Sequence, residues 1–348
     1  MGNSKPIKPY NLTRIARVTG ESLPGETLPN PNQTHIKYNV NATDLGIMWD
    51  KGDGEIFIAL GDTYGKCWGG SGAGPETAEW RSNVLAVSNN RNPEEGLIFS
   101  KMITDGLGSA KELICAERVY GREWTIIPTA GVTVGNKHYL HFMSIHRWGT
   151  DGNGRWKTNY SGVAISEDNG HTWVKSEQLK WENNKEYDHR FQQAAFVKED
   201  GYVYMFTTEN GRHGDIYLGR VIEEKIEFKD EYRYWDGSNW VEDERAAMPI
   251  TNGPAGELSV AYNSYYKKWI MIYLSPKHDG LVLRSSQSLT GPWSEEELLV
   301  SRNDYPRVYG GFIHPSFNDG KQLYFNMTQW DPYNVFWMKV DLVEEEKI

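Results

Sequence analysis

Two aspartates, Asp44 and Asp62, lie 18 residues apart and flank a predicted β-hairpin. Asp44 comes just before the apolar run 47–49, and Asp62 comes just after the apolar run 56–60. The sequence Asp-Lys-Gly-Asp-Gly between the two runs is typical of a turn. Because one strand starts where its antiparallel neighbour ends, we expect both carboxylates at one edge of the hairpin. A pair of carboxylates is what acid/base hydrolysis of a glycosidic bond requires.

Glu257 is a third acidic candidate, because it follows the small residues Gly-Pro-Ala-Gly and precedes an apolar strand. Small residues there would let a ligand approach the backbone closely. A single carboxylate near a turn often only caps backbone groups, so the prediction depends on the three together. We expect Asp44 to act as base or nucleophile, and Asp62 or Glu257 to act as the acid with a pKa raised by burial. Inverting and retaining mechanisms, which differ in carboxylate separation, both stay open.

Further polar and aromatic residues at predicted strand ends are candidates for substrate binding. Arg81 and Asn83 follow the glycine-rich segment 68–75, and an arginine near two aspartates would keep one of them ionised. The alternative for Arg81 is a structural ion pair. Arg212 lies in a tight turn and could hold substrate hydroxyls or only the turn itself. The remaining candidates for binding or stacking are Trp124, Glu209, His314, Gln329 and Trp330.

The elements that would position these residues are short β-strands. Runs rich in Val, Ile, Tyr, Phe and Trp alternate with Gly, Asn and Asp turns, and amphipathic helices are nearly absent. The runs group into five units, at about 41–104, 124–181, 190–236, 255–301 and 310–342. We expect the first strand of the last unit at 312–317, with His314 near its start. The last unit is one strand short, and the segment 12–19 reads as a strand without a partner. We therefore predict an all-β, single-domain, five-bladed β-propeller whose last blade is closed by the N-terminal strand.

Several motifs favour structural over chemical roles. The octapeptide Ser-Glu-Asp-Asn-Gly-His-Thr-Trp at 166–173 matches the Asp-box pattern, a turn tied by its aspartate. His138 and His141 alternate along a predicted strand without a third ligand at suitable spacing, so we expect no metal and no cofactor. Cys67 and Cys115 are the only cysteines, and the sequence leaves open whether they form a bridge.

Composition narrows the class of partner. The 348-residue chain carries a net charge of −10, which argues against binding to nucleic acid phosphates. No apolar stretch approaches the ~18 residues of a membrane span. The first ten residues lack the apolar core of a signal peptide, so we expect either an intracellular protein, export by another route, or a secreted or cell-surface protein whose signal was removed ahead of this sequence. With 14 Trp and 20 Tyr, the chain suits a polysaccharide or oligosaccharide partner, and we expect a monomer.

The ordered combination of motifs resembles the DUF4185 family. The motifs are Thr-Asp-Leu-Gly at 43–46, Gly-Asp-Thr at 61–63, Ile-Pro-Thr at 127–129, the Asp box, Asn-Gly-Arg at 210–212, Gly-Glu-Leu-Ser at 256–259 and Gln-Trp at 329–330. That family is similar to five-bladed-propeller glycoside hydrolases, and its characterised members resemble endo-D-arabinanases. The resemblance implies that the aspartates at positions 44 and 62 take part in catalysis.

Three functional hypotheses follow. The leading one is a glycoside hydrolase, endo-acting on arabinofuranose-type (D-arabinan) or related cell-wall glycans. The second is a carbohydrate-binding propeller without catalysis, such as a lectin or phage adhesin, which would need no paired carboxylates. The third, prompted by the Asp box, is a sialidase-like enzyme. Such enzymes have several Asp boxes, an arginine triad and a tyrosine nucleophile, and this chain shows one clear box.

Overall fold

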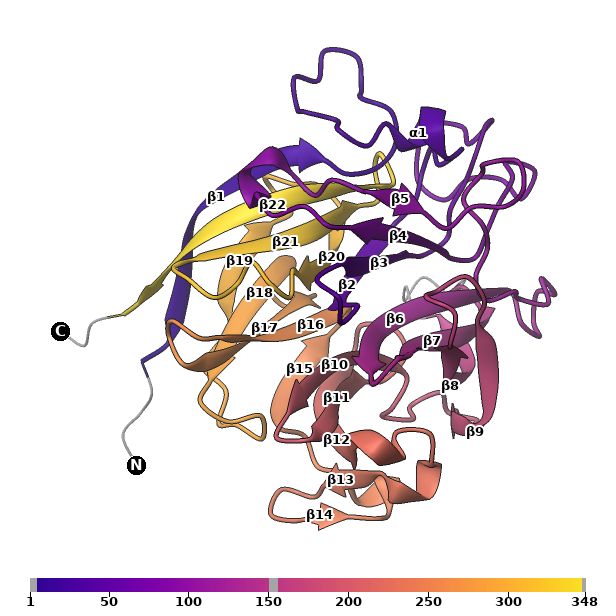
Figure 1. Ribbon diagram of the computed structural model, residues 1–348. Helices are drawn as coiled ribbons and strands as arrows, with labels where there is room; N and C mark the ends of the chain where they lie inside the picture. Colours follow the sequence, from indigo (N-terminus) through magenta and orange to yellow (C-terminus); the bar gives the residue numbers. More distant parts are fainter. Residues whose placement is uncertain (1–4, 150–155, 346–348) are drawn as a thin grey trace.

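The computed structural model describes residues 5–149 and 156–345. In this part of the chain the strands form five antiparallel sheets (Figure 1). The first strands of the sheets, β2, β6, β10, β16 and β20, contact one another in that order, and β20 contacts β2 again. The sheets therefore stand as blades around a central axis, which confirms the predicted all-β, five-bladed propeller.

Four blades are built from consecutive strands, numbered along the chain, and the last blade also contains the first strand. The first two blades comprise β2 (Leu45–Asp50), β3 (Ile56–Leu60), β4 (Val84–Ser88) and β5 (Lys101–Met102), then β6 (Thr125–Val134), β7 (Lys137–Arg147), β8 (Lys157–Ser166) and β9 (Val174–Glu182). The third comprises β10 (Gln193–Glu199), β11 (Tyr202–Thr208), β12 (Gly214–Ile222), β13 (Arg233–Trp235), β14 (Trp240–Val241) and β15 (Thr251–Ala255). The last two comprise β16 (Leu258–Asn263), β17 (Lys268–Ser275), β18 (Gly280–Ser286) and β19 (Glu297–Ser301), then β20 (Val308–Ile313), β21 (Gln322–Gln329), β22 (Asn334–Glu344) and β1 (Ile7–Arg17).

Helices are few and short. The structure contains α1 (Thr34–Lys37) and the 3-10 turns η1 (Pro93–Glu95), η2 (Glu223–Lys225), η3 (Lys229–Glu231) and η4 (Glu244–Ala246) within the described residues. No helix among them is long and apolar enough to cross a membrane.

The N-terminal strand closes the ring, as the sequence predicts. β1 pairs antiparallel with β22, from Ile7 opposite Glu344 to Arg17 opposite Phe336, so the two chain ends lie side by side (Figure 1). The strand begins five residues earlier than the predicted segment 12–19. The last blade thus combines the first and last strands of the chain.

Apolar side chains pack between neighbouring blades. The strand β3 is buried along its whole length, because both its faces contact other sheets, and its sequence Ile-Phe-Ile-Ala-Leu is apolar throughout. The first two blades approach each other closely at Gly131 of β6, where an added Cβ would lie 2.2 Å from the Trp49 ring of the first blade. The large Trp49 side chain therefore requires glycine at this position of the second blade.

The Asp box forms the turn that its sequence predicts, between β8 and β9. The Asp168 carboxylate accepts hydrogen bonds from the backbone N–H of Thr172 at 2.9 Å and from its hydroxyl at 2.6 Å. Trp173 donates through Nε1 to the Gly170 carbonyl at 3.0 Å. Burial alone would raise the pKa of Asp168, but the hydrogen bonds that its carboxylate accepts lower that pKa to about 2. The motif is a structural turn at a blade edge.

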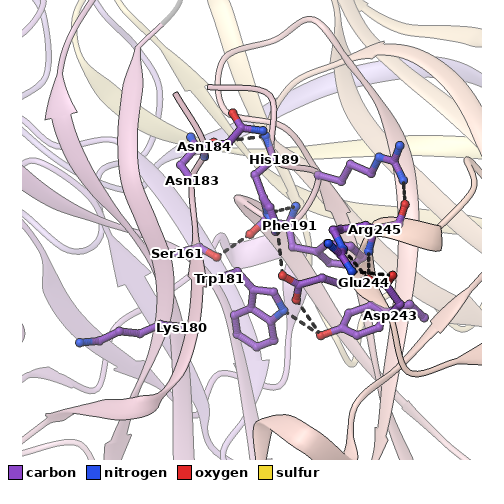
Figure 2. A network of polar contacts seen from close by, with 12 residues as sticks. Ser161, Lys180, Trp181, Asn183, Asn184, His189, Phe191, Asp243, Glu244 and Arg245 are labelled. Carbon is purple, nitrogen blue, oxygen red and sulfur yellow. Dashed lines mark hydrogen bonds and ion pairs between the residues drawn. The ribbon is translucent and has the colours of Figure 1, made fainter. Parts of the chain in front are cut away.

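The outer part of the third blade is tied to the second by the polar network in Figure 2. His189, ahead of β10, contacts Glu244 of η4, with 3.1 Å between Nε2 and Oε1. The other Glu244 oxygen accepts from Tyr234 at 3.2 Å and pairs with Lys229 at 3.1 Å. Trp181 of β9 donates through Nε1 to the Tyr234 hydroxyl at 3.0 Å. Burial alone would raise the pKa of Glu244, but His189 and Lys229 lower it to about 2.

One prediction of local structure is wrong, and one question that the sequence left open is settled. The first strand of the last blade was expected at 312–317, but β20 runs from Val308 to Ile313. His314 therefore follows the end of this strand and does not mark its start. Cys67 and Cys115 are both free and exposed, so no bridge joins them.

Candidate active site

A cavity of about 710 Å³ opens where the first strands of the blades begin. All three predicted acidic residues line it, together with two of the predicted binding residues, Arg212 and Trp330. The size falls within the range of small-molecule and cofactor sites, about 300–1,000 Å³. The full lining is Asp44, Leu45, Asp62, Ala73, Ile127, Pro128, Thr129, Met143, Trp148, Gly149, Trp156, Gln193, Ala194, Arg212, Glu257, Leu258, Arg302, Arg307, Tyr309, Phe312, Trp330 and Tyr333.

Asp44 is placed by an irregularity at the start of β2. Leu45 and Gly46 both have positive φ, 66° and 88°, and the pairing with β3 shifts by one residue there. The side chain is 8% exposed, and its Oδ2 accepts a hydrogen bond from the Tyr309 hydroxyl at 2.8 Å. Oδ1 is buried and has no hydrogen-bond partner among the described residues. Gly61 faces it so closely that an added Cβ would lie 2.2 Å from Oδ1.

This environment disfavours the ionised form of Asp44. Burial is the main cause, and the nearby Asp62 carboxylate adds to it, so the pKa of Asp44 rises to about 7. The nearby hydroxyl groups of Tyr309 and Tyr333 act in the opposite direction. Asp44 therefore exchanges its proton near neutral pH.

Asp62 lies just after β3 and is held by donors from two other elements. Its Oδ1 accepts from Trp80 Nε1 and from the Thr125 hydroxyl, each at 2.7 Å. The side chain is 4% exposed, and burial raises the pKa of Asp62 to about 7 although these two hydrogen bonds lower it. Arg118, whose guanidinium lies 4.3 Å from the centre of the Trp80 ring, also favours the ionised form. Asp62 thus accepts more hydrogen bonds than Asp44, which favours its ionised form.

Glu257 forms an ion pair with Arg212, and both residues line the cavity. The Arg212 Nε atom donates to both carboxylate oxygens at 3.2 and 3.0 Å, and Nη2 donates to Oε1 at 2.7 Å. The guanidinium also lies 5.2 Å from the Trp156 ring and 5.3 Å from the Tyr309 ring. Burial works to lower the pKa of Arg212, but Glu257 raises it overall. Both oxygens of Glu257 are engaged, so it could donate a proton only after this pair breaks.

Aromatic rings form much of the remaining wall. Trp148 and Trp156 contact each other edge to face at 5.9 Å, and Trp330 contacts Tyr333 in the same way at 5.4 Å. Trp156 Nε1 is buried without a hydrogen-bond partner in the described part of the chain. Trp124, also predicted to bind substrate, is absent from the lining and packs against Trp80 at 5.3 Å. It supports the ring that holds Asp62.

Arg81 and Asn83 do not meet the aspartates. Arg81 donates to the backbone carbonyls of Ala110 at 3.1 Å and Asn39 at 2.7 Å, so the expected contact with an aspartate is wrong. Asn83 is fully buried, and its side-chain amide donates to two carbonyls and accepts from two backbone N–H groups. Both side chains hold backbone segments behind the site.

Three further candidates also lie outside the lining. His314 is 2% exposed, stacks on Phe317 at 4.2 Å and has its pKa lowered to about 3 by burial. Gln329 bridges Arg14 and the Pro306 carbonyl at 3.3 and 3.1 Å. Glu209 is half-buried beside Gly214. These residues do not contribute to the cavity wall.

The sequence prediction missed the partners of the two aspartates: Tyr309, Trp80 and Thr125. Tyr309 occupies the second position of β20, but the shifted strand assignment placed it in a loop. Thr125 begins β6 at the edge where Asp62 also lies, so the strand-start argument could have found it. No cluster of three His, Cys, Asp or Glu side chains suited to a metal occurs in residues 5–149 or 156–345.

Comparison with known proteins identifies the family. Residues 29–339 match the family described as "Domain of unknown function (DUF4185)", so the chain belongs to this family. It is 34% identical over 312 residues to "Notoamide biosynthesis cluster protein J" of Aspergillus sp. (strain MF297-2), covering 84% of this chain and 81% of that protein. A second relative, "Notoamide biosynthesis cluster protein J'" of Aspergillus versicolor, is 33% identical over 310 residues, covering 84% and 82%.

Solved structures share the fold at low sequence identity. A putative hydrolase from Bacteroides ovatus aligns with a TM-score of 0.61 at 14% identity, covering 87% of this chain and 86% of that one. An exo-beta-1,3-galactanase from Phanerochaete chrysosporium, solved with beta-1,3-galactotriose, aligns at 0.54 and 9%, covering 95% and 64%. A GH43_1 enzyme from Xanthomonas citri, complexed with xylotriose, aligns at 0.52 and 13%, covering 87% and 88%. The chain thus has the propeller fold of these glycoside hydrolases.

Proposed function

We propose that this protein is a glycoside hydrolase in which Asp44 and Asp62 work as an acid/base pair on a saccharide bound in the cavity. The observation that carries the proposal is that two buried carboxylates line one cavity and both have a pKa raised to about 7. Such a coupled pair holds about one proton at neutral pH. One group can then protonate the leaving oxygen while the other attacks or activates water.

The hydrogen bonds favour a particular assignment of roles. Asp62 accepts two strong hydrogen bonds, which stabilise its anion, so we assign it as base or nucleophile. Asp44 has an oxygen without a donor and lies near two other carboxylates, so we assign it as the acid. This order is the reverse of the one expected from the sequence. Glu257, bound to Arg212, serves in this proposal to hold the wall and to raise the pKa of Asp44.

The test compares Asp44→Asn and Asp62→Asn with the parent. Release of reducing ends is measured on arabinan-type polymers, on other plant and bacterial polysaccharides, and on small aryl glycosides. On substrates whose leaving group needs protonation, we expect each variant to lose about 10²–10⁴-fold in kcat, the usual contribution of a general acid or base. Asp53→Asn is the matched control, because Asp53 lies exposed in the turn at the other end of the same hairpin. Activity within a few-fold of the parent in both test variants would exclude the pair from the mechanism.

The role assignment has its own readout. Azide should restore turnover in Asp62→Asn, where a small anion can replace the missing base or nucleophile. Asp44→Asn should instead retain activity on aryl glycosides whose leaving group needs no protonation. The opposite pattern would make Asp44 the base or nucleophile and Asp62 the acid, and both residues would remain in the mechanism.

The relatives favour a second candidate, in which the substrate is a small glycosylated metabolite and not a polymer. Proteins 33–34% identical over most of this chain are named for a biosynthesis cluster. The cavity, of about 710 Å³, also has the size of a small-molecule site. Hydrolysis of small aryl glycosides without release from any polymer would support this candidate. Oligosaccharide binding without hydrolysis of any substrate would support the carbohydrate-binding alternative.

A further inference from the structure

Three arginines line the cavity, and two of them, Arg302 and Arg307, lie outside the ion pair with Glu257. Arg212 is engaged with Glu257 through two of its nitrogens. Arg302 uses Nε for the Val308 carbonyl and Nη1 for Asp279, each at 3.0 Å. Arg307 pairs through Nη1 with Asp331 at 2.6 Å. A guanidinium carries five N–H groups in a fixed fork, more than these contacts use on Arg302 or on Arg307.

Arg302 and Arg307 lie together on one side of the mouth, in the connection between β19 and β20. Arg307 has a φ of 58°, uncommon for a residue with a side chain, and its carbonyl accepts from the Trp330 backbone N–H at 3.2 Å. Its guanidinium lies 5.3 Å from the centre of the Trp330 ring. Their side chains are 30% and 58% exposed, so both can meet a ligand that enters the cavity.

The charge of the lining differs from that of the chain. Three arginines and three carboxylates line the cavity, whereas the whole chain carries a net charge of −10. Near neutral pH the pair Asp44 and Asp62 retains about one proton, so the lining residues alone carry about one more positive than negative charge before Asp279 and Asp331, the partners of Arg302 and Arg307, are counted. The partners Asp279 and Asp331 lie outside the lining and are 70% and 42% exposed, so water screens their attraction for the arginines.

We propose that Arg302 and Arg307 form a subsite for an anionic substituent, a carboxylate or a phosphate, on the saccharide that this cavity binds. The planar forks of two neighbouring arginines match the paired oxygens of either group. The Trp330 ring beside Arg307 offers a flat face to the sugar that carries the charge. The inference rests on the proposed function for the identity of the ligand as a saccharide, but the binding can be measured without hydrolysis.

The test is a titration of the intact protein at constant ionic strength, followed by tryptophan fluorescence and by calorimetry. The probes are D-glucuronate, inorganic phosphate and, as the neutral reference, D-glucose. We expect at least one anion to bind at least ten-fold more tightly than glucose. Arg307→Gln, and Arg302→Gln with Arg307→Gln, should lose that affinity ten-fold or more. Binding of glucuronate alone would assign a carboxylate substituent, and binding of phosphate alone would assign a phosphate.

Arg233→Gln is the matched control, because Arg233 also pairs with an exposed carboxylate, Glu242, but lies in the outer part of the third blade. It should leave all affinities unchanged. Equal weak binding of the three probes, or unchanged anion binding in Arg307→Gln, would overturn the subsite. Loss of hydrolysis in Asp44→Asn and Asp62→Asn with no anion preference would leave the proposed function standing and remove only this inference.

Discussion

The two aspartates of the site differ in the donors around them. Asp62 receives a tryptophan N–H and a threonine hydroxyl on one oxygen, while Asp44 receives one tyrosine hydroxyl and has a buried oxygen without a donor. Burial nevertheless raises both pKa values to about 7. Since they interact, they titrate as a pair, and the pH profile of the enzyme reports the pair and not either residue alone.

This coupling predicts a bell-shaped dependence of kcat/KM on pH with a maximum near 7. In Tyr309→Phe, Asp44 loses a hydrogen bond that lowers its pKa, so that pKa should rise by about half to one unit. If Asp44 is the acid, it stays protonated to higher pH, and the basic limb should move upward. The measurement is the pH–rate profile of parent and variant. A shift of the acidic limb would instead make Asp44 the base.

Thr125→Val gives the complementary prediction for Asp62. Loss of the threonine hydroxyl removes a donor that stabilises the Asp62 anion, so its pKa should rise by a similar amount. With Asp62 as base, the acidic limb of the profile should move to higher pH. Thr133→Val is the matched control, because the Thr133 hydroxyl contacts His138 and lies outside the cavity lining. An unchanged acidic limb in Thr125→Val would argue against Asp62 as the base.

Hairpin geometry was sufficient to predict that Asp44 and Asp62 share an edge, because Leu45 and Leu60 face each other in the antiparallel pair. The surroundings of each carboxylate were not predictable in the same way. Trp80 and Arg81 are neighbours in the chain, yet the tryptophan reaches Asp62 and the arginine holds backbone carbonyls. Which of two adjacent side chains faces the site depends on how the loop 61–83 folds, and no local pattern specifies that.

At the scale of elements, the start of β2 and the end of β3 set the position of Asp44. An added Cβ at Gly61 would lie 2.2 Å from Asp44 Oδ1. Gly61→Ala should therefore displace the Asp44 carboxylate and lower kcat by about ten-fold or more, since small misplacements of a reacting group are costly. Gly106→Ala is the control, because an added Cβ there meets nothing within 4 Å. Parent-like kcat in Gly61→Ala would show that the carboxylate tolerates the shift.

The network of Figure 2 predicts how the stability of the outer part of the third blade changes with pH. The folded-state pKa of Glu244 is about 2, below its ordinary value of 4.5, so its stabilising effect is complete above about pH 4.5 and is lost as pH falls toward 2. Glu244→Gln should lower the free energy of unfolding by about 1–2 kcal/mol at pH 7. The difference from the parent should shrink on acidification.

Chemical unfolding measured between pH 3 and pH 7 tests the prediction for Glu244. Glu242→Gln is the matched control, since the Glu242 side chain, paired with Arg233, is 81% exposed and its loss should change stability little at any pH. A destabilisation of Glu244→Gln that stays constant with pH would indicate lost packing and not lost charge.

The strands were predictable where apolar runs end at turn residues, and less so elsewhere. The run Ile-Phe-Ile-Ala-Leu of β3 is of the first kind. The strand β15 contains Gly253 and Pro254, which are typical of a turn, and it pairs with β12 only because the third blade brings the two together. In the last blade, Gly310 and Gly311 made the true start of β20 resemble a loop, and the predicted strand began four residues late.

The whole molecule depends on a single closure between the chain ends. Each of the other four blades is built from consecutive strands, but β1 and β22 come from opposite ends of the chain and pair along most of their length. The arrangement converts what would be an open edge of β22 into a paired strand. The ring holds the cavity residues of the first and last blades, Asp44 and Tyr309, at hydrogen-bond distance.

Removal of residues 1–17 should therefore affect stability and the site together. The shortened chain would lose the partner of β22 and expose Val335, Trp337 and Val340, so we expect a Tm at least 10 °C lower and a tendency to associate through the free edge. Thermal unfolding and size-exclusion chromatography measure the two effects.

A peptide of residues 5–20, added in trans, should bind the open edge and raise the Tm toward that of the full chain, whereas the same residues in scrambled order should not. A shortened chain that stays monomeric with an unchanged Tm would show that four blades and three strands hold the ring without the N-terminal strand.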